Sequence, residues 1–144
     1  MAQIVWGTCL LGWCTLIHVA IVTMSIPVVG RLGQAKLFQT RSTLRTSAIL
    51  LAVGLALLFG HSVQIWSWSL AFMWMGFFED TAQSFYFATV TYTTLGYGDI
   101  VLGAEARVFA TFAAVAGLFT FGVSTAYLIG VLGRILPDVF SQSS

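Results

Sequence analysis

Three long apolar runs alternate with short polar segments along the chain. The first extends from Ile4 to Ile26 without a charged residue, the second from Ser47 to Phe78, and the third from about Ala104 to Ile135. A helix needs about 20 apolar residues to cross a bilayer. We therefore expect three membrane-spanning helices, the first of them ended by Pro27 and Gly30.

The second run is longer than one crossing requires. Its first half, "SAILLAVGLALLFG", predicts a spanning helix, and its second half contains Trp66, Trp68 and Trp74. Because Trp favours the membrane–water boundary, we expect this helix to reach the interface and then turn. His61 and Gln64 lie one turn apart in this run, and they either hydrogen-bond to a neighbouring helix or bind a ligand.

A fourth apolar segment is too short to cross the membrane. Glu79 and Asp80 precede "TAQSFYFATVTYT", and acidic residues in this position favour a helix start because they complement the helix dipole. This helix has room for about 14 residues before the glycines of "TTLGYGD", so we expect it to enter the membrane only partway. Irregular backbone at that depth must be buried in protein or line a watery cavity.

The composition places the whole chain in the membrane. It is 58% hydrophobic and only 8% charged, whereas soluble domains carry about 25% charged residues. A net charge of +1 gives no basis for nucleic-acid binding. Cys9 and Cys14 point in different directions on a helix and are interpreted as apolar fillers. With His18 and His61 they form no credible zinc set, and we expect neither an enzyme nor a cofactor.

Basic residues indicate the orientation. The connector 31–46 holds four of the six basic residues and no acid, which predicts a cytoplasmic connector, an outside N-terminus and a cytoplasmic C-terminus. Four of the five acids then fall on the outer side, where they would raise the local concentration of cations: Glu79, Asp80, Asp99 and Glu105.

The glycines of the short irregular segment predict its backbone conformation. Gly96 and Gly98 can adopt positive φ, which other residues avoid. Alternating conformations of this kind let successive carbonyls point the same way. A single chain with three spanning helices has no enclosed pore, so several copies around an axis are needed to surround such carbonyls.

The segment "TTLGYGD", preceded by a short helix and placed between two spanning helices, resembles the potassium channel family, in particular its small three-helix prokaryotic-type members. The resemblance covers about residues 47–136 as outer helix, pore helix, filter and inner helix, and it leaves residues 1–30 outside as an additional transmembrane helix. Residues 137–144 are expected to form a short cytoplasmic tail.

This resemblance implies a passive, homotetrameric, potassium-selective channel in the lipid of a prokaryotic inner membrane. The family's known mechanism has backbone carbonyls replacing the water shell of K⁺. Carried onto this sequence, the filter comprises Thr94, Leu95, Gly96, Tyr97 and Gly98, and the K⁺ ligands are the first four of these. K⁺ is then the permeant ion and not a cofactor.

The sequence departs from the family pattern near the filter. Leu95 replaces the commoner Val, and Val90 supplies no carboxylate behind the filter. Tyr86 and Phe87 replace an aromatic pair that often contains Trp, so the indole bond to Asp99 is either lost or replaced by the Tyr86 hydroxyl. These departures keep open a non-selective monovalent cation channel. A non-conducting scaffold or regulatory subunit is a second alternative.

The last helix contains the candidate cavity and gate. Gly117, Thr120 and Ser124 share one helical face. Thr120 and Ser124 either line the cavity and hydrate the ion, or they pack against neighbouring helices. Gly117 and Gly122 are the candidate gating hinges.

Overall fold

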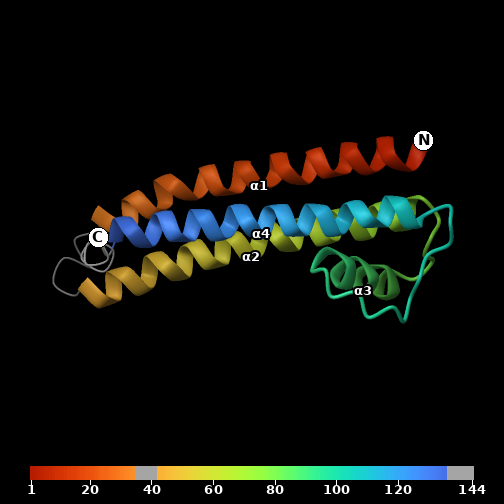
Figure 1. The fold of residues 1–144 in the computed structure, drawn as a ribbon. Coiled ribbons are helices and arrows are strands. Elements are labelled where there is room, and N and C mark those ends of the chain that lie inside the picture. The colour runs from red at the N-terminus through yellow and green to blue at the C-terminus, as the bar shows by residue number, and fades with distance from the viewer. Residues whose placement is uncertain (35–41, 136–144) are drawn as a thin grey trace, which may run out of the picture.

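The computed structural model describes residues 1–34 and 42–135, and these residues form helices and connecting loops without a strand. The helices are α1 (Ala2–Gln34), α2 (Ser42–Trp74), α3 (Thr81–Tyr92) and α4 (Arg107–Ile135). α1, α2 and α4 are long and apolar enough to span a membrane. They lie along one another as an elongated bundle, and the short α3 packs beside one end of it (Figure 1). The predicted all-α membrane architecture is confirmed.

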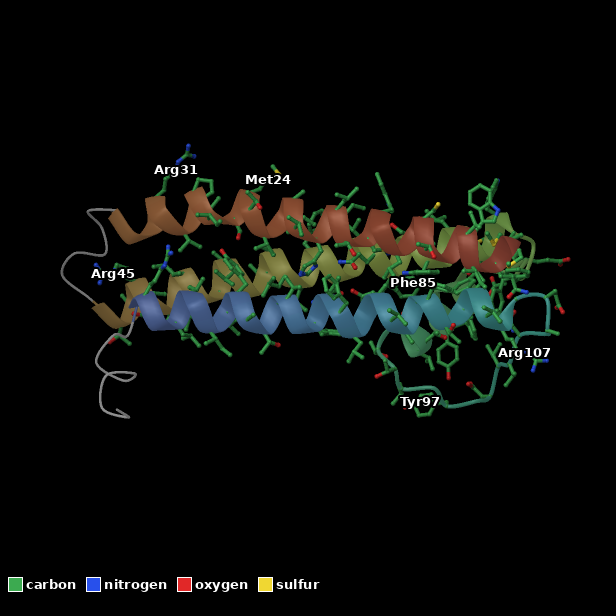
Figure 2. All side chains as sticks on the ribbon, turned by 45° about the horizontal axis from the view of Figure 1, so that its top comes forward. Met24, Arg31, Arg45, Phe85, Tyr97 and Arg107 are labelled. Atoms are coloured by element: carbon green, nitrogen blue, oxygen red, sulfur yellow. The ribbon has the colours of Figure 1, made fainter. Side chains whose placement is uncertain are left out.

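The three long helices alternate in direction. α1 begins at the end of the bundle where α2 finishes, where α3 lies and where α4 begins, whereas α4 finishes at the opposite end (Figure 1). Figure 2 shows Arg31 and Arg45 at this opposite end and Arg107 beside the loops that surround α3. The bundle therefore has three helices that could cross the membrane, and Arg31 and Arg45 lie at the end away from the loops. The predicted orientation depends on both of these features.

The prediction that Pro27 and Gly30 end the first helix is wrong. α1 continues through both residues to Gln34. Proline removes one backbone donor, but membrane helices tolerate it where neighbouring groups satisfy the freed carbonyl. The connector is correspondingly shorter than the predicted 31–46, since α2 already begins at Ser42. The predicted tail 137–144 and two basic residues of the connector lie outside the described residues: Lys36 and Arg41.

The interior of the bundle has three layers. Near α3, aromatic rings pack closely, with Phe72 centred 5.2 Å from Phe87 and 5.6 Å from Phe109. At the far end, Ile49, Val53, Leu57 and Val131 form an apolar cluster. Between them lies a set of six buried polar side chains, called here the polar layer: His18, His61, Gln64, Tyr92, Thr120 and Ser124.

α1 is tied to α4 near the start of both helices. The Gln3 side-chain oxygen accepts hydrogen bonds from the backbone N–H of Val108 (3.1 Å) and Phe109 (3.2 Å). These donors lie in the first turn of α4, where backbone N–H groups have no partner within the helix. One turn further along α1, Gly7 leaves room for the Phe112 ring, which a Cβ atom at this position would overlap. α1 therefore packs as an integral part of the bundle.

Candidate functional site

α3 is fixed at its beginning by a capping residue. Asp80 has extended backbone angles, and its Oδ2 accepts a hydrogen bond from the backbone N–H of Gln83 at 2.8 Å. One turn later the Ser84 hydroxyl donates to the backbone carbonyl of Ser69 on α2 at 2.8 Å. The acid pair Glu79–Asp80 therefore marks the helix start as predicted, with Asp80 as the cap, while Ser84 holds α3 against α2.

α3 ends in a turn that starts the glycine-containing loop. The N–H of Thr94 donates to the Thr91 carbonyl, and the N–H of Leu95 donates to the Val90 carbonyl, both at 3.0 Å. This pair of bonds, with Thr94 at φ 59°, is the Schellman arrangement that closes many helices. The Val90 carbonyl also accepts the N–H of Gly96 at 3.2 Å. The contribution of Val90 behind the loop is therefore made through its backbone.

Positive φ angles recur at every second residue of this segment, called here the TLGYG loop (residues 94–98). Thr94, Gly96 and Gly98 have φ of 59°, 57° and 77°. The predictions for Gly96 and Gly98 are confirmed. The left-handed Thr94 was not predicted, because a β-branched residue is an outlier in that region and no sequence signal marks it. A Cβ atom at either glycine would meet open space, so the backbone conformation is what requires glycine there.

The TLGYG loop lies open on the surface of the single chain. Leu95 is 55% exposed and Tyr97 is 67% exposed. Figure 2 shows Tyr97 on the outer side of the loop, away from the three long helices. No residue within 1–34 or 42–135 encloses the loop on this side, so in this part of the chain its backbone and its side chains are open to other molecules.

A hydrogen bond from α3 supports the end of the loop. The Tyr86 hydroxyl donates to Asp99 Oδ2 at 2.6 Å. This bond lowers the pKa of the Asp99 carboxyl and raises the pKa of the Tyr86 hydroxyl. Of the two outcomes expected for the missing indole, replacement by the Tyr86 hydroxyl is the one observed. Phe87 turns the other way, into the aromatic layer beside Phe72.

Removing this bond tests its role in the loop. We expect Tyr86→Phe to raise the pKa of Asp99, because the carboxylate loses the donor that stabilises its charge. The bond stabilises the loop at pH values where Asp99 is ionised, and this support is lost as the pH falls through the lowered pKa. In Tyr86→Phe this bond is absent at every pH, so the backbone amides of the loop should exchange their hydrogens faster even at neutral pH.

The difference is measured as hydrogen exchange of the loop amides over time at several pH values. Tyr127→Phe is the matched control, since it removes a hydroxyl that bonds Ser25 at 2.7 Å, far along α4 from the loop. Equal time courses for Tyr86→Phe and the unaltered chain would show that the bond does not support the loop.

The part of the chain that contains α2, α3, the TLGYG loop and α4 matches a known protein family. Residues 45–134, more than half of the chain, match the model of a family described as ion channel. The chain belongs to this ion channel family. No match was found among curated proteins or solved structures. The matched residues cover α2 from its first turn, α3, the TLGYG loop and α4 almost to its end, so this part of the chain is the ion channel domain.

The candidate cavity residues of the channel do not lie on an open surface. Thr120 is fully buried and Ser124 is 7% exposed. The Thr120 hydroxyl lies 2.7 Å from that of Tyr92, and the Ser124 hydroxyl lies 3.0 Å from a nitrogen of each histidine, His18 and His61. Of the two alternatives for Thr120 and Ser124, these contacts favour packing, because the hydroxyls are engaged between helices of one chain.

A different face of α4 is open in the channel chain. Leu118 is 69% exposed, Phe121 42% and Ile129 54%, and Thr125 on the same face is also exposed. These positions are three or four residues apart and form one stripe along the helix. The sequence does not single out this face, because Leu118 and Phe121 look like ordinary lipid-facing residues, whereas small hydroxyl residues suit both water and helix packing.

The two candidate hinge glycines of the channel differ in their surroundings. Gly117 is buried against the C-terminal end of α3, where a Cβ atom would overlap the backbone carbonyl of Tyr92. Gly122 has no atom close to the corresponding position. Gly117 therefore has a packing role that any substitution disturbs, so Gly122→Ala is the cleaner test of a hinge in α4.

Proposed function

We propose that four copies of this chain form a passive, potassium-selective channel in which the TLGYG loop is the selectivity filter. The observation that carries the proposal is the positive φ at every second residue of the loop, Thr94, Gly96 and Gly98. Alternating backbone conformations allow consecutive carbonyls to face one axis. A ring of carbonyls can replace the water shell of a bare cation. The carbonyls of Thr94, Leu95, Gly96 and Tyr97 are the proposed ligands of K⁺.

The open surfaces of the single chain support an assembly. The loop is exposed on one side, and irregular backbone at membrane depth needs protein or a watery cavity around it. Four copies around an axis would enclose the four loops and cover part of the exposed stripe on α4 that contains Leu118, Phe121 and Thr125. In this arrangement the stripe replaces Thr120 and Ser124 as the proposed cavity lining.

The distribution of charge supports cation entry. The four acidic residues of the described chain lie near the loop end of the bundle, namely Glu79, Asp80, Asp99 and Glu105. Clustered carboxylates raise the local concentration of cations. With the basic connector on the cytoplasmic side of a prokaryotic inner membrane, this end of the channel faces outward.

The proposal is tested with the purified chain reconstituted in liposomes. We expect flux down a K⁺ gradient that Ba²⁺ blocks, because Ba²⁺ has about the size of K⁺ and lodges in a carbonyl filter. A matched Na⁺ gradient is expected to give no flux. Cross-linking of the reconstituted protein should trap species up to a tetramer.

Two other results would replace the proposal. Flux of both ions would favour a non-selective monovalent cation channel, which Leu95 and the tyrosine support of Asp99 motivate. Absence of flux from folded tetramers would favour a scaffold or regulatory subunit.

A further inference from the structure

The polar layer connects all four helices in the middle of the bundle. His18 comes from α1, His61 and Gln64 from α2, Tyr92 from the last turn of α3, and Ser124 from α4. Each of these side chains is at most 8% exposed. The two imidazole rings are only 5.2 Å apart, and the Ser124 hydroxyl lies 3.0 Å from Nε2 of both. Two titratable rings therefore share the Ser124 hydroxyl, and the layer also contains Tyr92, two residues before the start of the TLGYG loop.

The contacts at one end of the layer fix the protons of His18. Gln64 Nε2 lies 3.3 Å from the Gly60 carbonyl, which can only accept, so this atom is the amide nitrogen. The same nitrogen lies 3.0 Å from His18 Nδ1. Because Gln64 donates here, His18 Nδ1 must accept, and a neutral His18 carries its proton on Nε2. That proton is donated to Ser124.

The protons of His61 follow from the same chain. With its oxygen accepting from His18, the Ser124 hydroxyl donates to His61 Nε2. A neutral His61 then carries its proton on Nδ1 and donates it to the Tyr92 hydroxyl at 2.8 Å. Tyr92 in turn has the Thr120 hydroxyl at 2.7 Å. With both rings neutral, donors and acceptors therefore match along the whole chain of hydrogen bonds. This chain begins on α2, passes through α1 and α4, returns to α2 and finishes at the end of α3.

An added proton interrupts this chain. On His18 it would occupy Nδ1 and face the donating amide of Gln64. On His61 the proton would occupy Nε2. The Ser124 hydroxyl would then lose its acceptor, and its oxygen would face an N–H donor from each of the two rings. His61 also stacks on Phe121 with the ring centroids 4.2 Å apart and an interplanar angle of 24°, a contact that an imidazolium favours. The close approach of the two rings leaves room for one positive charge, and His61 is the better place for it.

The surroundings of His61 contain few other groups that titrate. His18 and Cys14 face the layer from α1, Tyr92 faces it from α3, and the residues that α4 contributes are the uncharged Ser124 and Thr120. The acidic and basic residues of the described chain belong to the helix ends and the loops. A charge on His61 would therefore have no counter-ion nearby, and its effect would extend to the open face of α4, where Phe121 lies.

We propose that the His18–Ser124–His61 cluster is a proton sensor inside the membrane that controls conduction. The inference rests on the proposed function, because it describes the regulation of that channel. Protonation of His61 Nε2 by solvent protons breaks the hydrogen bond that the Ser124 hydroxyl donates to it. α4 is then no longer held to α2 at Ser124. It also places a positive charge behind Phe121, beside the proposed cation path. Both effects reduce cation flux, so acid closes the channel.

The first test is K⁺ flux from liposomes at equal pH on both sides. For the unaltered chain we expect flux to fall about tenfold, the size of an ordinary coupling between two sites, between about pH 7.5 and about pH 4. This range extends below the usual one for histidine because the ring is buried without a counter-ion. His61→Gln keeps a polar side chain that does not titrate, and its flux is expected to stay level over this range.

Ser62→Ala is the matched control. It alters the residue beside His61 and removes an exposed hydroxyl whose hydrogen bond goes to the Leu58 carbonyl of its own helix at 2.8 Å. Its flux is expected to keep the acid response. A conducting unaltered chain with level flux from about pH 7.5 to about pH 4 would overturn the inference and leave the channel standing. A full acid response in His61→Gln would overturn it as well.

A second measurement works even if the chain conducts nothing. In reconstituted protein with ¹⁵N-labelled histidine, NMR should find one ring protonated at Nε2 and the other at Nδ1 at neutral pH, with His18→Gln assigning the signals. On acidification His61 should become an imidazolium while signals of the Tyr92 ring shift. Identical tautomers, or a His61 that stays neutral to about pH 4, would overturn the sensor whether or not flux is observed.

Discussion

Replacing Gly96 with alanine is expected to abolish K⁺ flux. Gly96 has φ of 57°, a conformation that costs other residues roughly 1–2 kcal/mol each. In a tetramer the strain is repeated in four loops around one axis, for a total of about 4–8 kcal/mol. Because open space surrounds the new methyl group, the protein should fold and assemble while the loop leaves its alternating conformation. Flux from liposomes should fall to the level of empty vesicles.

Gly54→Ala is the control for this experiment. Gly54 lies inside α2, where it has ordinary helical geometry and no neighbouring atom near the position of a Cβ. Its substitution should leave flux unchanged. If Gly96→Ala conducts K⁺ as well as Gly54→Ala does, the alternating backbone of the loop is not what carries the ion.

Replacing Gly117 with alanine is expected to destabilise the fold itself. The added methyl group would overlap the Tyr92 carbonyl, which is backbone and cannot rotate away, so α4 must separate from the end of α3. Overpacking of this kind typically costs about 1–3 kcal/mol, and here it also pulls on the hydrogen bonds of Tyr92 to His61 and Thr120. The loss should appear as unfolding at lower denaturant concentration in detergent, followed by circular dichroism.

Gly122→Ala separates this packing effect from a general intolerance of α4 to substitution. Gly122 lies five residues further along the same helix with open space around it, so its alanine variant should unfold at the concentration found for the unaltered chain. Should both variants be equally stable, the close approach of α4 to α3 is not maintained in the membrane. A change in open probability without loss of stability in Gly122→Ala would support a hinge at that residue.

The spanning helices were predictable because the bilayer sets their length. Hydropathy found α1, α2 and α4, and it showed that α3 is too short to cross. The acids before α3 and the glycines after it also have local physical causes, namely the helix dipole and the left-handed backbone. Because these causes act within a few residues, the Asp80 cap and the positive φ of Gly96 and Gly98 follow from the local sequence.

The remaining features do not follow from hydropathy or from a single residue type, and the inward-facing polar residues depend on contacts between segments far apart in the sequence. Pro27 is expected to stop a helix, yet α1 continues through it to Gln34. Thr94 is left-handed because the Schellman turn demands it. Thr120 and Ser124 turn inward because Tyr92 and the two histidines offer partners there. A pattern within one helix cannot show which of its polar residues will find partners on another.

The polar layer also determines the depth at which each helix sits. Hydrocarbon surfaces of neighbouring helices fit at many axial offsets, since lipid is as apolar as the helices themselves. The hydrogen bonds of the polar layer form at only one axial offset. Sliding α1 by a single turn, about 5.4 Å, would separate His18 from both Gln64 and Ser124, each of which lies 3.0 Å from it. The layer thus acts as a ruler at the centre of the membrane, and the first helix, although it lies outside the matched channel domain, is held in register with the loop.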